Sequence, residues 1–370
     1  MKRILLGFLC PVLALGMFAG CAKETRTTAA AAEVLSAQPK TSQSSETFSE
    51  NTGTNTASPL PIQADADLEI EKGLHIAVVA KSTEGNYWKQ MKKQMKETAT
   101  YFNEFYGLAG EDAIQMTFEG PDSEADIDVQ INTIDAVLSE NPSVLCLAAI
   151  DMNSCQAQLE TAQDNGIPVV LFDSGIKHST DTAFCATDNK AAGAEAASRL
   201  CAAINETGNA AVFAHASYTQ TSKDRIQGFC REIRKNHPGV TVAGVYTEDQ
   251  EEDMEAVIRK VLEDGQTDAV FCTTQTLAEQ VLAIQEEYPE NTLAMVGFDA
   301  GKMQLQAIRE GREIGTIVQN IPLIASQTIQ TALCAATPGQ AEHLEKYMKA
   351  DYLWTDRYNL DQTRQDGLLY

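Results

Sequence analysis

Polar side chains follow most of the apolar runs in this 370-residue sequence. Carboxylates, amides and hydroxyls make up most of the set, and two aromatic side chains, Tyr87 and Trp88, stand among them. Carboxylate and amide oxygens accept hydrogen bonds from vicinal hydroxyls, and flat rings cover the apolar face of a sugar. The set therefore suits a polyhydroxylated ligand, and its members are Asn86, Tyr87, Trp88, Asp151, Asp173, Ser174, Lys223, Thr274, Asp299 and Gln319.

The apolar runs have the length of β-strands and alternate with segments of helical period. The predicted strands are His75–Ala80, Ile114–Phe118, Val144–Ala148, Pro168–Phe172, Ala210–Ala214, Val240–Val245, Ala269–Cys272, Leu293–Phe298 and Gly315–Val318. The predicted helices are Asn86–Asn103, Ser123–Ser139, Ser154–Asn165, Asn189–Ile204, Ser222–Asn236, Gln250–Glu263, Leu277–Glu286 and Pro322–Ala335. Ser123 with Asp126 is expected to form a capping box at the start of the second helix.

Strands that are apolar throughout, and that alternate with helices, indicate parallel sheets covered on both faces. We therefore expect an α/β fold with doubly wound parallel sheets, and the number of β–α repeats favours two such units over one. In open parallel sheets, ligands bind beyond the carboxyl ends of the strands. The polar set above lies just after the apolar runs, so we expect it to gather at those ends.

Several members of the set also have ordinary structural interpretations. Asn86 could cap the first helix, and Asp299 could cap the helix that follows it. Adjacent residues on a helix cannot both face one cleft, so one of Tyr87 and Trp88 is expected to pack inward. Lys223 could be a solvated surface charge.

The N-terminus has the layout of a secretory signal. Lys2 and Arg3 precede the apolar run Ile4–Phe18, which ends on Ala19, Gly20 and Cys21. The run is too short for a membrane-spanning helix, which needs about 20 apolar residues. A cysteine directly after Ala-Gly resembles the bacterial lipobox, in which the thiol receives a lipid. We expect a signal peptide over residues 1–20, lipidation of Cys21, and a disordered tether over residues 21–67, a Thr-, Ser- and Ala-rich segment without apolar periodicity.

Composition excludes several classes of function. The formal net charge of -24 argues against nucleic acid as a partner, and against any contact with the bilayer other than through the Cys21 lipid. The histidines and cysteines lack zinc-ligand spacing, and neither a GxSxG elbow nor a dinucleotide motif occurs. We therefore expect no catalytic residue, no metal and no cofactor. The seven cysteines after Cys21 are expected to be mostly buried, small hydrophobic residues, and Arg225 to be a structural ion-pair partner.

From about His75 onward, the chain resembles the ribose-type (type I) periplasmic binding proteins, whose fold is shared with the effector domains of LacI-like repressors. Six segments in order carry the resemblance: Ser82-Thr83 with Asn86-Tyr87-Trp88, Gly166 to Asp173, Thr187-Asp188-Asn189, Arg225 to Phe229, Val296 to Asp299, and Gly315 to Gln319. The resemblance implies ligand contacts from Asn86, Tyr87, Trp88, Asp173, Asp299 and Gln319. Ser174, Lys223 and Thr274 depart from residues common in pentose and hexose binders, which puts a standard pentose in doubt.

The resemblance also implies two lobes joined by a three-strand hinge that closes around the ligand, with crossings near Thr187, Gln319 and Leu353. The expected N-terminal lobe comprises residues 68–187 with 320–352, and the C-terminal lobe residues 188–319 with 353–370. The expected function is that of a monomeric, lipid-anchored, extracytoplasmic receptor that captures a sugar or similar ligand and delivers it to the permease of an ABC transporter. Two alternatives stay open: a sensory receptor acting on a membrane kinase or chemoreceptor, and a surface-anchored glycoside hydrolase using Asp173 and Asp299.

Overall fold

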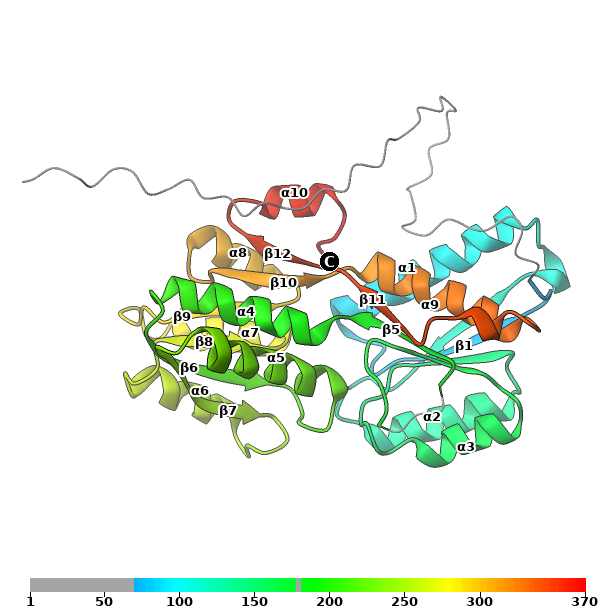
Figure 1. Ribbon diagram of the computed structural model, residues 1–370, viewed down its shortest axis with the longest axis horizontal. Helices are drawn as coiled ribbons and strands as arrows, with labels where there is room; N and C mark the ends of the chain where they lie inside the picture. Colours follow the sequence, from blue (N-terminus) through cyan, green and yellow to red (C-terminus); the bar gives the residue numbers. More distant parts are fainter. Residues whose placement is uncertain (1–69, 178–180) are drawn as a thin grey trace, which may run out of the picture. The chain divides into compact units, whose positions relative to one another are not determined.

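A computed structural model describes residues 70–177 and 181–370, and the strands in these residues form two six-stranded sheets (Figure 1). The predicted signal peptide, the lipidated Cys21 and the tether lie outside the described residues. All neighbouring strands in the described part pair in parallel, except β10 with β12. The predicted α/β class, with two mainly parallel sheets, is confirmed.

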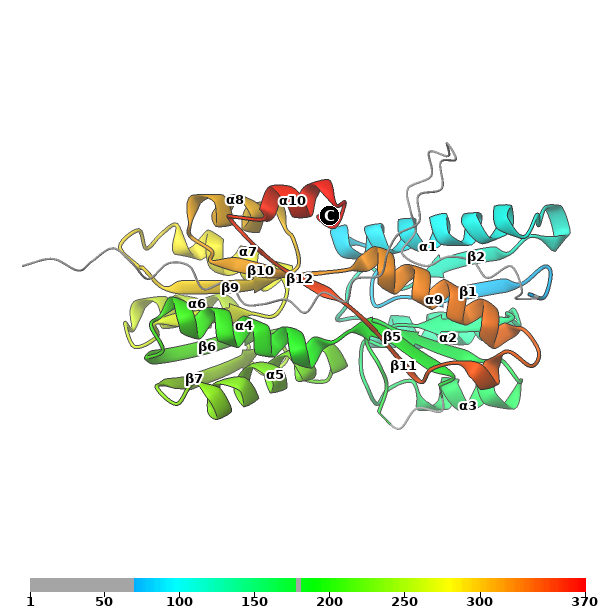
Figure 2. The ribbon, with the colours of Figure 1, turned by 45° about the horizontal axis from the view of Figure 1, so that its top comes forward.

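The first sheet has the order β11-β5-β4-β3-β1-β2. Its strands are β1 (His75–Val79), β2 (Gln115–Glu119), β3 (Val144–Leu147), β4 (Val169–Phe172), β5 (Ala183–Thr187) and β11 (Tyr347–Ala350). Helices cover both faces, which explains why the central strands are apolar throughout. One face packs against α1 (Gly85–Phe105) and α9 (Ile321–Ala336), and the other against α2 (Ile127–Ser139) and α3 (Gln156–Asp164), as Figure 2 shows. We call this sheet with its four helices the first lobe.

The second sheet has the matching order β12-β10-β9-β8-β6-β7. Its strands are β6 (Gly208–Ala214), β7 (Val240–Thr247), β8 (Ala269–Cys272), β9 (Ala294–Phe298), β10 (Gly315–Gln319) and β12 (Tyr352–Asp356). One core lies under α4 (Asn189–Ala203) and α5 (Gln220–Asn236), and another under α6 (Met254–Glu263) and α7 (Gln275–Gln285). Two further helices, α8 (Lys302–Glu310) and α10 (Leu360–Gln365), share a small third cluster. We call this sheet with its helices the second lobe.

The chain passes between the two sheets three times. It leaves the first sheet after Thr187, returns after Gln319, and leaves again between Ala350 and Tyr352. The first two crossings touch each other, since the Thr187 hydroxyl donates a buried hydrogen bond to Gln319 Oε1 at 2.8 Å.

Two glycines allow α4 and α5 to approach closely. A Cβ atom on Gly193 would lie 2.2 Å from the carbonyl oxygen of Arg225, and one on Gly228 would lie 2.1 Å from that of Lys190. Any larger residue would push the helices apart. This close crossing fixes the position of α5, which carries Arg225.

The nine predicted strands correspond to β1–β4 and β6–β10, with ends shifted by at most two residues. Strands β5, β11 and β12 were not predicted from apolar runs. The predicted capping box is wrong, because α2 begins at Ile127 and the Ser123 hydroxyl accepts a hydrogen bond from the Ala125 amide in a preceding turn. The helix expected from Gln250 begins only at Met254, where the Asp253 carboxylate caps it.

Candidate ligand-binding site

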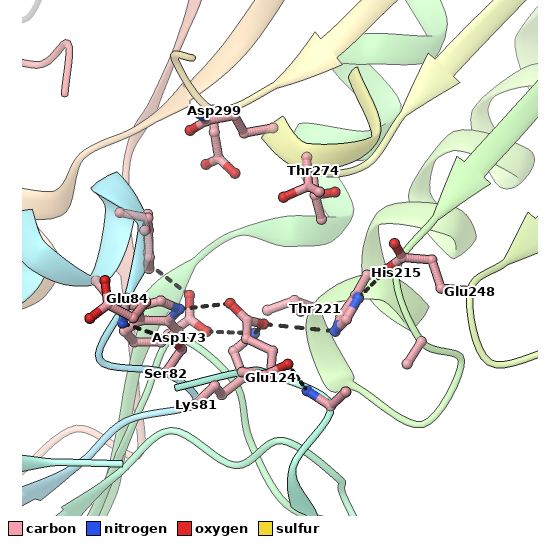
Figure 3. A pocket seen from close by; sticks show the side chains of 18 of the residues that line it. Lys81, Ser82, Glu84, Glu124, Asp173, His215, Thr221, Glu248, Thr274 and Asp299 are labelled. Carbon is pink, nitrogen blue, oxygen red and sulfur yellow. Dashed lines mark hydrogen bonds and ion pairs between the residues drawn. The ribbon is translucent and has the colours of Figure 1, made fainter. Parts of the chain in front are cut away.

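A cavity of about 550 Å³ lies between the carboxyl ends of the two sheets. The first lobe supplies the loops after β1, β2 and β4, and the second lobe those after β6, β7, β8 and β9 with the end of β10. Figure 3 shows Asp299 and Thr274 across the cavity from Lys81, Asp173 and Glu124. The location agrees with the general rule for open parallel sheets.

Asp173, at the end of β4, is the central acid of the first lobe. Its backbone has a φ of 56°, in the left-handed region that Asp tolerates better than most residues. Its Oδ1 accepts a hydrogen bond from the Tyr87 hydroxyl at 2.7 Å, and its Oδ2 lies 3.2 Å from Lys81 Nζ. Burial and the nearby carboxylate raise the pKa of Tyr87 well above its usual value, so the phenol stays a donor.

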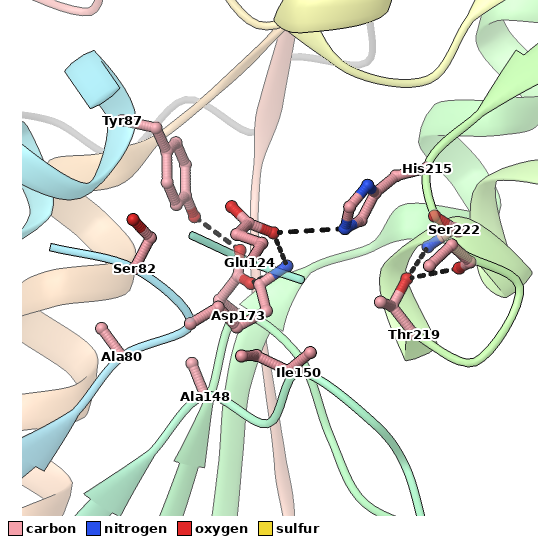
Figure 4. A network of polar contacts seen from close by, with 12 residues as sticks. Ala80, Ser82, Tyr87, Glu124, Ala148, Ile150, Asp173, His215, Thr219 and Ser222 are labelled. Atoms are coloured by element: carbon pink, nitrogen blue, oxygen red, sulfur yellow. Dashed lines mark hydrogen bonds and ion pairs between the residues drawn. The ribbon is translucent and has the colours of Figure 1, made fainter. Parts of the chain in front are cut away.

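Glu124 joins the same network from the loop after β2 (Figure 4). It lies 3.1 Å from Lys81 Nζ, and its Oε1 accepts a hydrogen bond from Trp88 Nε1 at 2.6 Å. Burial alone would raise the pKa of Glu124, but Lys81 and His215 outweigh it and lower that pKa to about 2. Burial alone would also lower the pKa of Lys81, and the two carboxylates reverse this and raise it. Lys81 is therefore a charged bridge between the two acids.

Two contacts near this network join the lobes. His215, directly after β6, lies 3.8 Å from Glu124 of the first lobe and 2.5 Å from Glu248 of its own lobe. The Met152 amide donates to the Tyr218 carbonyl at 3.1 Å. The cavity is thus bounded by direct interactions between the lobes.

Asp299, at the end of β9, is the central acid of the second lobe. Its φ is 70°, and its Oδ1 accepts hydrogen bonds from Gln319 Nε2 at 2.8 Å and from the Tyr370 hydroxyl at 2.7 Å. The Tyr370 ring also meets Tyr87 edge to face, with centroids 5.9 Å apart. Burial and Asp299 raise the pKa of Tyr370 well above its usual value.

Arg225 provides the second buried cation of the cavity. Its Nε donates to Asn189 Oδ1 and its Nη1 to the Thr273 carbonyl, both at 2.8 Å, while the guanidinium lies 3.5 Å from the centre of the Phe298 ring. The expectation of a structural ion pair is wrong, because its hydrogen-bond partners in the described residues are neutral and its side chain lines the cavity.

Seven of the ten sequence-predicted residues line the cavity: Asn86, Tyr87, Trp88, Asp173, Thr274, Asp299 and Gln319. Trp88 is the inward-packed neighbour of the aromatic pair, since it is 3% exposed and meets Phe172 edge to face. Neither Asn86 nor Asp299 caps a helix, because those positions belong to Glu84 and Gly301.

The other three predicted residues, Asp151, Ser174 and Lys223, do not line the cavity. The structure therefore corrects their prediction as ligand contacts. Asp151 closes a local turn by accepting hydrogen bonds from Asn153 and Ser154. Ser174 is fully buried behind Asp173. Lys223 is exposed, because it lies on the opposite side of α5 from Arg225.

Nine charged or aromatic lining residues were missed as ligand contacts: Lys81, Glu84, Asp122, Glu124, His215, Tyr218, Arg225, Glu248 and Asp249. Lys81 and His215 directly follow buried strand ends, so the rule that selected Asp173 would also have found them. Glu124 lies five residues beyond β2, within the turn mistaken for a capping box. No pattern in the sequence gives that position.

No group of three or more His, Cys, Asp or Glu residues in the described ranges is arranged to hold a metal ion. Five of the predicted cysteines, Cys146, Cys155, Cys185, Cys201 and Cys272, are buried and unpaired. None of the helices described here is long and apolar enough to cross a membrane.

The matched sheets and the polar cavity between them define a solute-binding protein of the type I periplasmic architecture. A family model described as a periplasmic binding protein domain matches residues 76–341, and the chain belongs to this family of binding proteins, which are not enzymes. The ribose import binding protein of Haemophilus influenzae is 21% identical over 211 residues, which cover 57% of this chain and 72% of that protein.

Solved structures have the same fold. A carbohydrate transporter solute-binding protein from Agrobacterium radiobacter, in complex with D-arabinose, matches with a TM-score of 0.71 and 19% identity over 80% of this chain and 99% of that chain. An ABC transporter solute-binding protein from Agrobacterium vitis, bound with α-D-tagatopyranose, matches with a TM-score of 0.72 and 21% identity at the same coverages.

Proposed function

We propose that this protein is an extracytoplasmic receptor that captures a small polyhydroxylated ligand, a sugar in the first instance, and delivers it to an ABC transporter permease. The observation that carries the proposal is the pair of aspartates at matching strand ends, facing one cavity together with aromatic and amide side chains. Carboxylates that accept hydrogen bonds from hydroxyls, beside flat rings, suit a sugar. The sugars bound by the Agrobacterium proteins and the ribose import role of the Haemophilus protein support the same class of ligand.

The ligand contacts we propose are Asn86, Tyr87, Trp88, Asp173, Thr274, Asp299 and Gln319, together with Lys81 and Arg225. The lobes we propose are residues 68–187 with 320–352 and residues 188–319 with 353–370, with a hinge at the three crossings. Ligand that touches both lobes stabilises their closed arrangement, and that arrangement is what a permease would recognise.

A thermal-shift screen of pentoses, hexoses, amino sugars, polyols and nucleosides tests the proposal, because a ligand that binds only the folded protein raises its melting temperature. Isothermal titration calorimetry then gives the dissociation constant. We expect at least one sugar to bind with a stoichiometry of one. A screen in which nucleosides bind and every sugar fails would contradict the assignment.

We further propose that the mature protein is anchored through a lipid on Cys21, since the apolar run ends on Ala-Gly-Cys. The variant Cys21→Ser is expected to lose incorporation of radiolabelled palmitate while the cavity keeps its affinity for ligand. Unchanged labelling would remove the lipid anchor from the proposal and leave the receptor function standing.

A further inference from the structure

We propose that the ligand carries a protonated amino group as well as hydroxyls, as an amino sugar with a free amine does, and that Asp299 receives the ammonium. This inference rests on the proposed sugar-receptor function and deepens it by naming the class of sugar.

The first observation is the charge of the cavity. Seven of its 24 lining residues are acidic, against 52 of 370 in the whole chain, so acids are about twofold enriched in the lining. The basic side chains of the lining are Lys81 and Arg225, beside His215. Seven carboxylates against Lys81 and Arg225 leave the cavity with a formal charge of -5, or -4 when His215 is counted as a third cation. The acids are Glu84, Asp122, Glu124, Asp173, Glu248, Asp249 and Asp299.

The second observation is independent of that count and concerns Asp299 alone. The side chain is only 8% exposed, and it has no ion pair with any Lys, Arg or His in the described residues. Its Oδ1 is occupied by two donors, Gln319 and Tyr370, whereas its Oδ2 has no hydrogen-bond partner in the part of the chain that the structure describes. Figure 3 shows this carboxylate on the cavity side of its loop.

The other buried acid of the cavity differs in this respect. Asp173 Oδ1 accepts a hydrogen bond from the Tyr87 hydroxyl, and its Oδ2, which accepts no hydrogen bond, has an ion-pair partner in Lys81 at 3.2 Å. Glu124 shares that lysine, and Glu248 contacts His215. Among the two buried acids of the cavity, Asp299 is therefore the one without an ion-pair partner in the described residues, and an ammonium group at its Oδ2 would supply that partner.

The arrangement of the acids across the cavity points the same way. Four belong to the first lobe and three to the second, so like charges face each other from both sides. A bound ligand displaces water, and the weaker screening increases the repulsion between the lobes. A neutral sugar leaves that repulsion in place, whereas a cationic one reduces it. A metal ion is a poorer occupant, because the described acids do not converge into a group that could coordinate one.

The test is calorimetry on the full chain with three matched sets of ligands: free hexosamines, their N-acetyl derivatives and the parent hexoses. At about pH 6.5 a free aliphatic amine is protonated. We expect the best hexosamine to bind about 10- to 150-fold more tightly than its N-acetyl and parent forms, as a charge-assisted hydrogen bond provides. The preference should shrink as salt is added, because salt screens the attraction.

The variant Asp299→Asn tests whether the preference for the free amine depends on the Asp299 carboxylate. Asparagine tolerates the positive φ and keeps an oxygen for Gln319 and Tyr370, while the negative charge is removed. If one charge-assisted bond accounts for the preference, the variant should bind a hexosamine no more than about threefold more tightly than its N-acetyl and parent forms. Asp361→Asn, at an acid whose side chain is 83% exposed, should leave the preference unchanged.

The possible outcomes separate this inference from the function on which it rests. Parent hexoses that bind as tightly as hexosamines would overturn the amine and leave the sugar receptor intact. A retained preference in Asp299→Asn would overturn the assigned residue. Failure of all three ligand sets to bind would overturn the amino-sugar inference, and the sugar-receptor function would fall with it only if the pentoses and polyols of the wider screen also failed to bind.

Discussion

The two lobes place an aspartate at the same point of the same sheet. The sheets have matching strand orders, and Asp173 after β4 occupies the place that Asp299 has after β9. Both residues adopt a positive φ, and the Oδ1 of each accepts a hydrogen bond from a tyrosine hydroxyl at 2.7 Å. The difference lies in the remaining partner, since Asp173 pairs with the buried Lys81 and Asp299 accepts from the neutral Gln319. One acid is therefore part of the protein's own ion pairing, and the other has no cationic partner in the described residues.

The comparison predicts the largest effect on stability for the variant Lys81→Met. Removing the cation leaves Asp173 and Glu124 as adjacent carboxylates without the lysine they share, and breaking a buried pair in this way costs about 3–5 kcal/mol. For a chain of this size the melting temperature should fall by roughly 10 °C. Differential scanning calorimetry without ligand measures the effect.

Asp299→Asn is the matched control, because no ion pair is lost there, and its melting temperature should stay within about 2 °C of wild type. Equal destabilisation by both changes would mean that the two acids have the same structural role. The variant Lys81→Met with Asp173→Asn should recover part of the lost stability, since one of the stranded charges is removed.

A second contrast concerns the buried groups beneath the two cavity walls. The first lobe uses a neutral side chain, Gln130, which donates to the Ala80 and Ala148 carbonyls and accepts from the Ile150 amide. In the second lobe, Gln304 donates to the Phe298 carbonyl at the end of β9 and to a buried acid, Glu313. Burial raises the pKa of Glu313 to about 8.

The next largest effect is therefore a pH dependence specific to the second lobe. Between about pH 4.5 and 8 the folded state holds a proton on Glu313 that the unfolded chain has released, so stability from this group is complete below pH 4.5 and declines until pH 8. At pH 7 the loss amounts to roughly 3 kcal/mol. Glu313→Gln should melt higher than wild type at pH 8 and show no such gain at pH 5.

Melting curves of both proteins at the two pH values provide the measurement. The exposed Glu286→Gln serves as the control and should show the same shift from wild type at both pH values. A Glu313→Gln curve parallel to wild type across the whole range would mean that Glu313 is ionised in the folded protein.

The sequence predicted the sheets better than the site, and the reason is physical. Central strands such as Val144–Leu147 are buried on both faces and therefore apolar throughout, which makes them visible as runs. The edge strand β11 lacks that signal, since it is half exposed and carries the polar Lys349. The strand β5, Ala183–Thr187, contains an apolar run of four residues, as long as the predicted Ala269–Cys272, so the same rule could have found it.

At the site, the sequence could predict which residues lie at the strand ends, but it could not predict which of their side chains point into the cavity. The end of an apolar run located Asp173 correctly, but the adjacent Ser174 turns away from the cavity. Helical periodicity could have separated Arg225 from Lys223, because residues two apart lie on opposite sides of a helix. Tyr370 meets Asp299 from 71 positions away, and no local pattern encodes such a contact.

The third prediction compares the two acids directly as ligand contacts. Asp299→Asn should weaken binding of the best ligand by about 10- to 150-fold, the equivalent of one charge-assisted hydrogen bond of about 1.5–3 kcal/mol, without changing the melting temperature. Asp173→Asn should lower both affinity and melting temperature, because Lys81 loses a partner. Calorimetric titrations and melting curves on the same samples separate the two patterns. An Asp299→Asn protein that binds as wild type does would strike that acid from the site.

The smallest effect expected is that of Tyr370→Phe, which tests how Asp299 is positioned. The phenol donates to Oδ1 and, with Gln319, holds the carboxylate so that Oδ2 faces the cavity. Loss of one such hydrogen bond, worth about 0.5–1.5 kcal/mol, should weaken ligand binding by about 2- to 10-fold with little change in melting temperature. Tyr358→Phe, at a side chain that is 90% exposed, is the matched control and should bind as wild type does.

A double-mutant cycle distinguishes positioning from an independent contact with the ligand. If Tyr370 acts through Asp299, then Tyr370→Phe should have almost no further effect on affinity in the Asp299→Asn background. If the two losses instead add in free energy, the phenol contacts the ligand by itself. The two tyrosines would then differ in role as well as in partner. Tyr87 lines the cavity and holds Asp173 through its hydroxyl. Tyr370 would bind the ligand directly without positioning Asp299.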